Sequence, residues 1–164
     1  MINPERLAEL ARLKENQNRK YFIRLKARIP KDLDETVREL HDNAFQQINC
    51  LDCANCCKHL GPRIMDRDIE RISKFLKLKK DKFIKTFLKI DEDGDYIFQN
   101  MPCPFLLPDN YCSVYEVRPK ACEEYPHTNR RKFHQLFLIT IKNTYTCPAA
   151  FDIVEGLKKK YLQI

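Results

Sequence analysis

The apolar residues of the N-terminal third recur every three or four positions, which predicts helices over residues 2–28 and 33–48. The step Ile29-Pro30 separates them, because the residue before a proline disfavours helical backbone. Residues 14–20 are nearly all polar, so we expect the first helix to project or fray there. The second helix has one apolar face, made of Leu33, Val37, Leu40, Ala44 and Ile48.

Helical spacing returns after residue 65. Asp66 can cap a helix whose apolar positions are Ile69, Ile72 and Leu76, and a second short helix begins near Asp81. The stretch 91–95 (DEDGD) predicts a turn, because its glycine does not stand where a calcium-binding EF-hand loop needs one. The next three residues, 96–98 (YIF), predict a strand and therefore a short hairpin.

The last third is less regular. The proline-rich stretch 101–130 predicts long loops, and the apolar run Phe133–Ile141 is long enough for a strand. Residues 149–162 predict a final helix. The pattern as a whole predicts a mostly helical α+β fold, irregular, with long loops and a short hairpin.

The composition adds the expectation that bound metal holds this irregular part together. The chain has 164 residues with 8 cysteines and only 3 glycines, and no two glycines are close enough for a dinucleotide or P-loop motif. Residues 1–30 lack the apolar run of a secretion signal, and no stretch resembles a membrane span. We therefore expect a cytoplasmic protein without membrane contact, whose reduced thiols bind metal rather than form disulfides.

The formal net charge of +7 does not indicate a nucleic-acid partner. The basic excess is spread along the chain, whereas a nucleic-acid binder concentrates it in a stripe or tail. Thiols that ionise on a metal lower the net charge, so the basic residues can balance a metal site.

The densest chemical feature is the run Cys50-x2-Cys53-x2-Cys56-Cys57. C-x2-C spacing lets two sulfurs face one metal, and C-x2-C-x2-C opens bacterial ferredoxin motifs. The ferredoxin continuation is absent, because Leu60 stands where the fourth cysteine would be. Four thiolates fill one zinc site or one iron–sulfur cluster, so eight permit one or two sites. The ligands we predict are Cys50, Cys53, Cys56, Cys57, Cys103, Cys112, Cys122 and Cys147.

The order of these motifs resembles the YkgJ-type cysteine-cluster family, whose members are described as zinc- or iron-chelating. The resemblance rests on the CxxCxxCC run followed by C-P-F-L from residue 103, C-S-V-Y-E-V-R-P-K-A-C over 112–122, and Cys147-Pro148. It covers roughly residues 50–150 and implies that all eight cysteines bind metal. We accordingly expect an N-terminal helical extension, 1–49, and a cysteine-cluster metal-binding domain, 50–164.

The metal and the biochemical role stay open at this level. The ferredoxin-like spacing and the Cys-Pro pairs favour an iron–sulfur cluster, of the 4Fe-4S type, over zinc. Arg118 is predicted to offset the thiolate charge from outside the ligand set, as a cofactor-binding residue. His59 and His127 are weaker ligand candidates because eight thiols are available.

Three roles fit these features. The chain is a metal-binding protein, a cluster-dependent group transferase, or a metal carrier that exchanges metal with a partner. The resemblance also extends to the cysteine-rich part of flagellin lysine N-methylases, which implies the transferase, although no methyl-donor pocket is recognisable. Whether the chain is an enzyme is therefore undecided. The N-terminal helices could dock a protein partner in any of the three.

Overall fold

The computed structural model describes residues 4–161, and its helices and strands fall into two compact units. Unit 1 joins residues 1–53 with 126–164, and unit 2 comprises residues 54–125. The elements of unit 1 are α1 (Pro4–Ala27), α2 (Leu33–Gln47), α3 (Cys50–Cys53), the 3-10 helix η2 (Phe133–Leu136), α8 (Phe137–Asn143) and α9 (Pro148–Lys160). Those of unit 2 are α4 (Asn55–His59), α5 (Asp66–Phe75), α6 (Lys80–Phe87), β1 (Leu88–Ile90), β2 (Tyr96–Phe98), the 3-10 helix η1 (Tyr115–Val117) and α7 (Lys120–Glu124).

The mostly helical α+β fold predicted from the pattern is confirmed. The expected helices over 2–28, 33–48 and 149–162 correspond to α1, α2 and α9, although the predicted start at residue 2 and the end at residue 162 lie outside the described residues. The division into 1–49 and 50–164 concerns the extent of the metal-binding pattern and stays a prediction.

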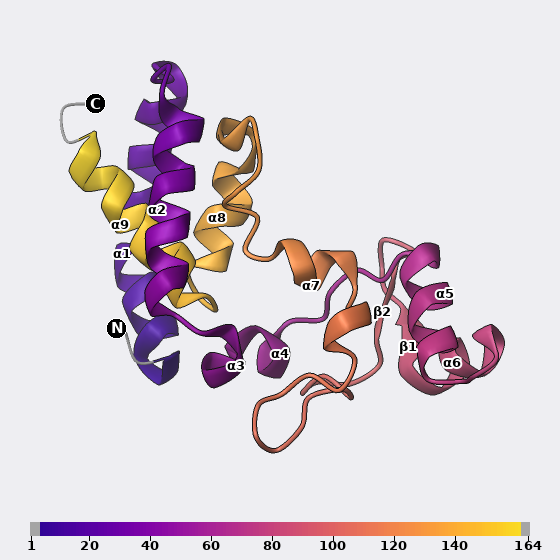
Figure 1. Cartoon of the computed structure of the whole chain (residues 1–164). Helices are drawn as coiled ribbons and strands as arrows, with labels where there is room; N and C mark the ends of the chain where they lie inside the picture. The colour runs from indigo at the N-terminus through magenta and orange to yellow at the C-terminus, as the bar shows by residue number, and fades with distance from the viewer. Residues whose placement is uncertain (1–3, 162–164) are drawn as a thin grey trace. The chain divides into compact units, whose positions relative to one another are not determined.

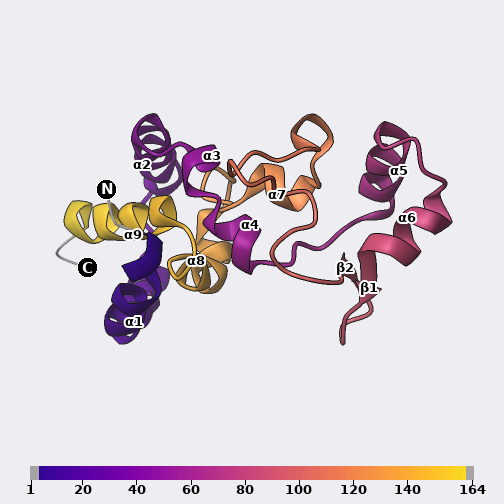
Figure 2. The same ribbon diagram turned by 90° about the horizontal axis from the view of Figure 1, so that it is seen from below.

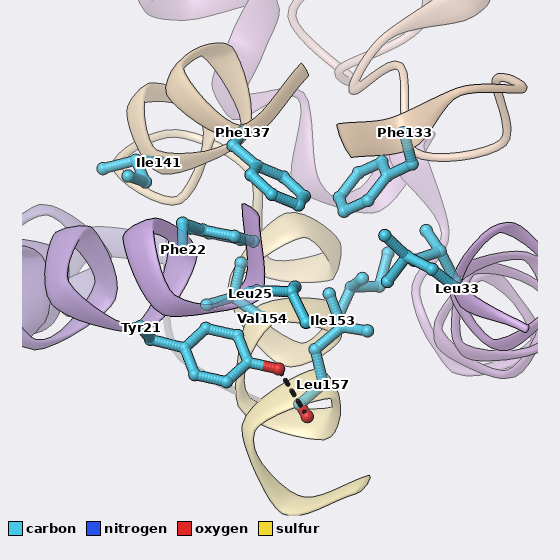
Figure 3. Packing of buried hydrophobic residues seen from close by; sticks show 11 residues of the cluster. Tyr21, Phe22, Leu25, Leu33, Phe133, Phe137, Ile141, Ile153, Val154 and Leu157 are labelled. Atoms are coloured by element: carbon cyan, nitrogen blue, oxygen red, sulfur yellow. Dashed lines mark hydrogen bonds between the residues drawn. The ribbon is translucent and has the colours of Figure 1, made fainter. Parts of the chain in front are cut away.

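Unit 1 is a helical assembly in which α9 packs against α2, α1 and α8 (Figures 1 and 2). Its core is a cluster of aliphatic and aromatic side chains drawn from all four helices (Figure 3). Phe22 of α1 stacks on Phe137 of α8 with ring centroids 4.5 Å apart. The hydroxyl of Tyr21 donates to the carbonyl of Leu157 at 2.8 Å, so the polar end of a buried ring is also satisfied. Apolar burial therefore holds this unit together.

The polar stretch 14–20 does not project or fray, which corrects the expectation from its sequence. Helix α1 is continuous there, and Asn18 is only 1% exposed. Lys14 Nζ pairs with Glu155 of α9 at 2.6 Å, and Lys158 Nζ donates to Asn18 Oδ1 at 2.9 Å. Polar side chains join two helices here because each finds a partner on α9.

The run Phe133–Ile141 is helical, not a strand. The carboxylate of Asp34 in α2 accepts the main-chain N–H groups of Lys132 and Phe133, at 2.8 and 3.0 Å, and so begins η2. Phe133, Phe137 and Ile141 then face the core, whereas Leu138 is 70% exposed. A short apolar run fits a buried strand or a helix equally well, and only the capping partner from another helix decides it.

Unit 2 combines two short helices with the predicted hairpin, and Figure 2 shows α5 and α6 preceding it. The strands pair antiparallel, with Leu88 opposite Phe98 and Ile90 opposite Tyr96. Asp91 Oδ1 accepts the N–H groups of residues 93 and 95, and Gly94 takes φ +84°, so the DEDGD turn is confirmed. A separate core of mainly aromatic and aliphatic side chains lies between these elements, centred on Phe83 and Phe105.

Candidate metal centre

The eight cysteines are divided between the two units. Unit 1 contains Cys50, Cys53 and Cys147, whereas unit 2 contains Cys56, Cys57, Cys103, Cys112 and Cys122. All eight lie among the described residues and none is in a disulfide. The CxxCxxCC run forms two helical turns, α3 and α4, because Ala54 between them adopts a left-handed conformation with φ 46°.

In unit 2, the main chain joins three cysteine-bearing segments. The N–H of Cys103 donates to the carbonyl of Cys57 at 2.8 Å. An isolated bridge pairs Leu106 with Cys112, and the N–H of Ser113 donates to the carbonyl of Phe105 at 2.9 Å. Cys103 and Cys112 both pack against the core of this unit. Their loop is therefore anchored to α4 on one side and to the hydrophobic core on the other.

The segment that carries Cys122 is held by a buried carboxylate. Asp68 of α5 is 2% exposed, and its Oδ1 accepts the N–H of Lys120 at 3.1 Å and an Arg71 N–H at 2.7 Å. The same guanidinium donates to the carbonyl of Arg118 at 2.8 Å. Asp68 Oδ2 also accepts the N–H of Met65, the residue before α5. One acid thus ties the start of α5 to the start of α7.

Arg118 lies beside two of the thiols in unit 2. Its guanidinium stacks on the ring of Tyr115, 4.0 Å from the ring centroid, and Nη1 donates to the carbonyl of the same tyrosine at 2.8 Å. Burial raises the pKa of Cys112 and of Cys122, and the positive charge of Arg118 opposes this in small part. This is the position in which a cation would offset thiolate charge.

The thiols of unit 2 influence one another's ionisation. Burial, together with the charges of Cys57, Cys103 and Cys112, raises the pKa of Cys122 to about 12. Burial raises the pKa of Cys103 to about 11 and also raises that of Cys112. Cys57 differs: a hydrogen bond from Cys56, with the sulfurs 4.0 Å apart, lowers the pKa of Cys57 to about 7. A metal that binds the buried thiols must therefore displace their protons.

Main-chain N–H groups point at several of these sulfurs. The N–H groups of Phe105 and Leu106 donate to Cys103, and that of Val114 donates to Cys112. These donors lower the pKa of each thiol because they stabilise negative charge on sulfur. A proline follows Cys103, so the chain turns at once and brings the later N–H groups back over the sulfur.

Unit 1 repeats this arrangement at the start of α9. Cys147 is the residue before the helix, and the N–H groups of Ala149 and Ala150 donate to its sulfur. Burial nevertheless raises the pKa of Cys147 to about 12, and the charges of Cys50 and Cys53 raise it as well. Cys50 and Cys53 lie at the two ends of the single turn α3, where a spacing of three places side chains on one face.

The donor set suits a thiophilic metal, but the side chains are not converged as they stand. Between residues 4 and 161, no three His, Cys, Asp or Glu side chains are placed to hold one ion together. Cysteine thiols with N–H donors aimed at sulfur are the ligands that zinc and iron–sulfur clusters take. The residues therefore fit such a group in chemistry, and binding requires the thiols to close around it.

Sequence reasoning missed Asp68 and Arg71, which position the Cys122 segment. The available signal was a second acid in the first turn of the predicted helix, where only Asp66 was interpreted, as the cap; in the structure Met65 is the N-cap residue and Asp66 is the first residue of the helix. Among the residues that the structure describes, no helix combines the length and apolar composition that crossing a bilayer requires.

A family model matches the part of the chain that carries the cysteines. The model of the family called CxxCxxCC, "Putative zinc- or iron-chelating domain", matches residues 49–147, which include all eight cysteines. No solved structure matches the chain. The chain belongs to the CxxCxxCC family of zinc- or iron-chelating domains.

Proposed function

We propose that the protein binds an iron–sulfur cluster or zinc through its cysteines. The observation that carries this proposal is the grouping of Cys57, Cys103, Cys112 and Cys122 within one unit, three of them on main-chain segments joined to each other. Four thiolates are a complete ligand set for tetrahedral zinc or for a cubane cluster. The N–H donors at Cys103 and Cys112 favour the thiolate form that either group needs.

Arg118 has a defined part in this proposal. Four thiolates around one zinc ion or one cluster leave net negative charge. The guanidinium stacked on Tyr115 lowers the electrostatic free energy of that charge. The ferredoxin-like spacing and the two Cys-Pro steps favour an iron–sulfur cluster, of the 4Fe-4S type. Thiol ligands need a reducing compartment, so the proposal places the protein in the cytoplasm.

The test is the metal content of the full chain purified without oxygen. We expect iron with broad visible absorbance, or zinc without colour, and loss of metal when cysteines are replaced by serine. Arg118→Gln is expected to weaken retention against a chelator, whereas the matched Arg118→Lys keeps the charge and most of the retention. A colourless protein that contains neither iron nor zinc contradicts the proposal.

A metal carrier is the second candidate, because Cys50 is exposed among otherwise half-buried or buried thiols. An exposed ligand is accessible to a partner that accepts metal. Rapid loss of metal from the wild-type chain to a weak chelator supports this role, provided that Cys50→Ser lacks this rapidly released metal. Retention over hours contradicts it.

A further inference from the structure

The family description assigns metal binding to the domain without assigning ligands to centres. We propose that seven of the eight cysteines form two metal centres when their thiols close around metal, one in unit 2 with the ligands Cys57, Cys103, Cys112 and Cys122, and one in unit 1 with the ligands Cys50, Cys53 and Cys147. This inference rests on the proposed function and adds how the ligands are shared.

The unit 1 set follows from how α2 and α9 pack. Thr36 of α2 contacts Tyr161 after α9, with their hydroxyl oxygens 2.9 Å apart. A Cβ at Gly156 would lie 2.7 Å from Leu40 Cδ2. These two contacts show that the helices run antiparallel, because the higher residue number on α2 contacts the lower residue number on α9.

The same register carries the two cysteine segments to one end of the helix pair. About two turns beyond Leu40, α2 ends, and about two turns before Gly156, α9 begins at Pro148. Cys147 therefore starts α9 at the end of the pair where α2 leads into α3 and its two cysteines.

The unit 2 set is fixed by different contacts. The Cys103 N–H bonds to the Cys57 carbonyl, and the bridge to Leu106 carries Cys112 beside the Cys103 loop. Cys122 lies in α7, whose first N–H is held by Asp68, and is assigned to the set because it belongs to the same unit. All these contacts are within residues 54–125, so this set is assembled without any residue of unit 1.

The two sets differ in how many coordination positions of a metal they fill. Four thiols complete a tetrahedral site, whereas three leave a coordination position to a group outside the set. Cys50 is exposed, so the unit 1 centre is also the one that solvent reaches. Cys56 is not a ligand of the unit 2 centre in this assignment, because Cys57 fills that place through its link to Cys103.

The experiment compares serine variants of the full chain by metal equivalents per protein, after anaerobic purification and after reloading with zinc. We expect Cys122→Ser and Cys147→Ser each to lose about half of the wild-type metal, because each removes one of two centres. Adding Cys103→Ser to Cys122→Ser is expected to remove no more, whereas combining Cys122→Ser with Cys147→Ser removes all of it. The Cys56→Ser variant is expected to keep the wild-type number of metal equivalents, including those that Cys122→Ser loses.

Several results separate the possible failures. A wild-type chain without metal overturns the proposed function itself. Wild-type chain with metal that is lost completely in both single variants shows one composite centre and overturns only the two-centre inference. Because a variant can fail to fold, circular dichroism accompanies each measurement, and cobalt titration of the wild-type chain gives an independent reading. Two successive increments of tetrahedral cobalt absorbance support two centres, and a single increment overturns them.

Discussion

Asp68 is the buried carboxylate on which the Cys122 segment depends. A carboxylate that is 2% exposed requires charge-assisted partners, and it has them in Arg71 and in the N–H groups of Met65 and Lys120. Because these partners come from the residue before α5, from the middle of α5 and from the start of α7, one side chain couples the core of unit 2 to a cysteine-bearing segment.

We expect Asp68→Asn to lower the free energy of unfolding by about 2 kcal/mol, since it weakens several charge-assisted hydrogen bonds. The matched control is Asp66→Asn on the same helix, whose side chain is 82% exposed and whose ion pair with Lys80 is 3.9 Å long. The control is expected to change stability by less than about 0.5 kcal/mol. Urea unfolding measures both. Equal effects of the two variants would contradict the role given to Asp68.

Glu15 and Tyr145 give unit 1 a dependence on acid pH. The Tyr145 hydroxyl donates to Glu15, and this bond, together with that from Arg19, lowers the pKa of Glu15 below 4.5. A lowered folded-state pKa means stability that is present above the unfolded pKa and is lost as pH falls through the folded one.

The stability difference between wild type and Tyr145→Phe is therefore expected to be present at neutral pH and to shrink below about pH 4. Urea unfolding over a pH series measures it. In a Glu15→Gln background, Tyr145→Phe is expected to have the same effect at every pH of this series. A difference that grows toward low pH would show that another group is responsible.

At the scale of elements, partners from other helices decide what short apolar segments become. Phe133–Ile141 has the composition of a strand, yet it folds as η2 and α8 because Asp34 of α2 caps its first N–H groups. By contrast, α2 and α9 are long and periodic, and their sequences were sufficient to predict them. Segment length separates the predictable elements from the others.

The close packing of α9 on α2 makes a prediction about Gly156. Alanine in a helix interior gains about 1 kcal/mol over glycine, but its Cβ would lie 2.7 Å from Leu40 Cδ2. Overpacking costs about 1–3 kcal/mol, so we expect Gly156→Ala to destabilise the protein by about 1 kcal/mol. In a Leu40→Ala background, the same substitution is expected to stabilise by about 1 kcal/mol, since the obstacle is removed. Four urea unfolding curves measure this cycle, and the same effect in both backgrounds would contradict it.

At the scale of the whole molecule, each unit has its own core, but the two cores differ in size and in what holds the loops around them. Unit 1 is closed by apolar side chains from α1, α2, α8 and α9. In unit 2, the segment 99–114 has only an isolated bridge and turns between its cysteines. We infer that metal contributes more to the order of unit 2 than to that of unit 1.

Removal of metal is therefore expected to raise hydrogen exchange most in residues 99–125 and least in α1, α2 and α9. The measurement is hydrogen exchange of the full chain with and without a chelator, read out by mass spectrometry. The control for incomplete removal by the chelator is a chain that has been stripped of metal under denaturing conditions and then refolded. Uniform protection before and after stripping would show that metal does not order unit 2.

The sequence by itself determined the chemistry and the long elements of this protein. Cysteine spacing predicted thiol ligands for a metal, and helical periodicity identified α1, α2, α5 and α9, because both signals are local. Only the tertiary structure could divide the CxxCxxCC run between two units and place Cys147 at the end of the helix pair that leads to α3. Cysteines far apart in the chain are brought into one unit through helix packing and buried polar contacts, and such contacts leave no mark in local spacing.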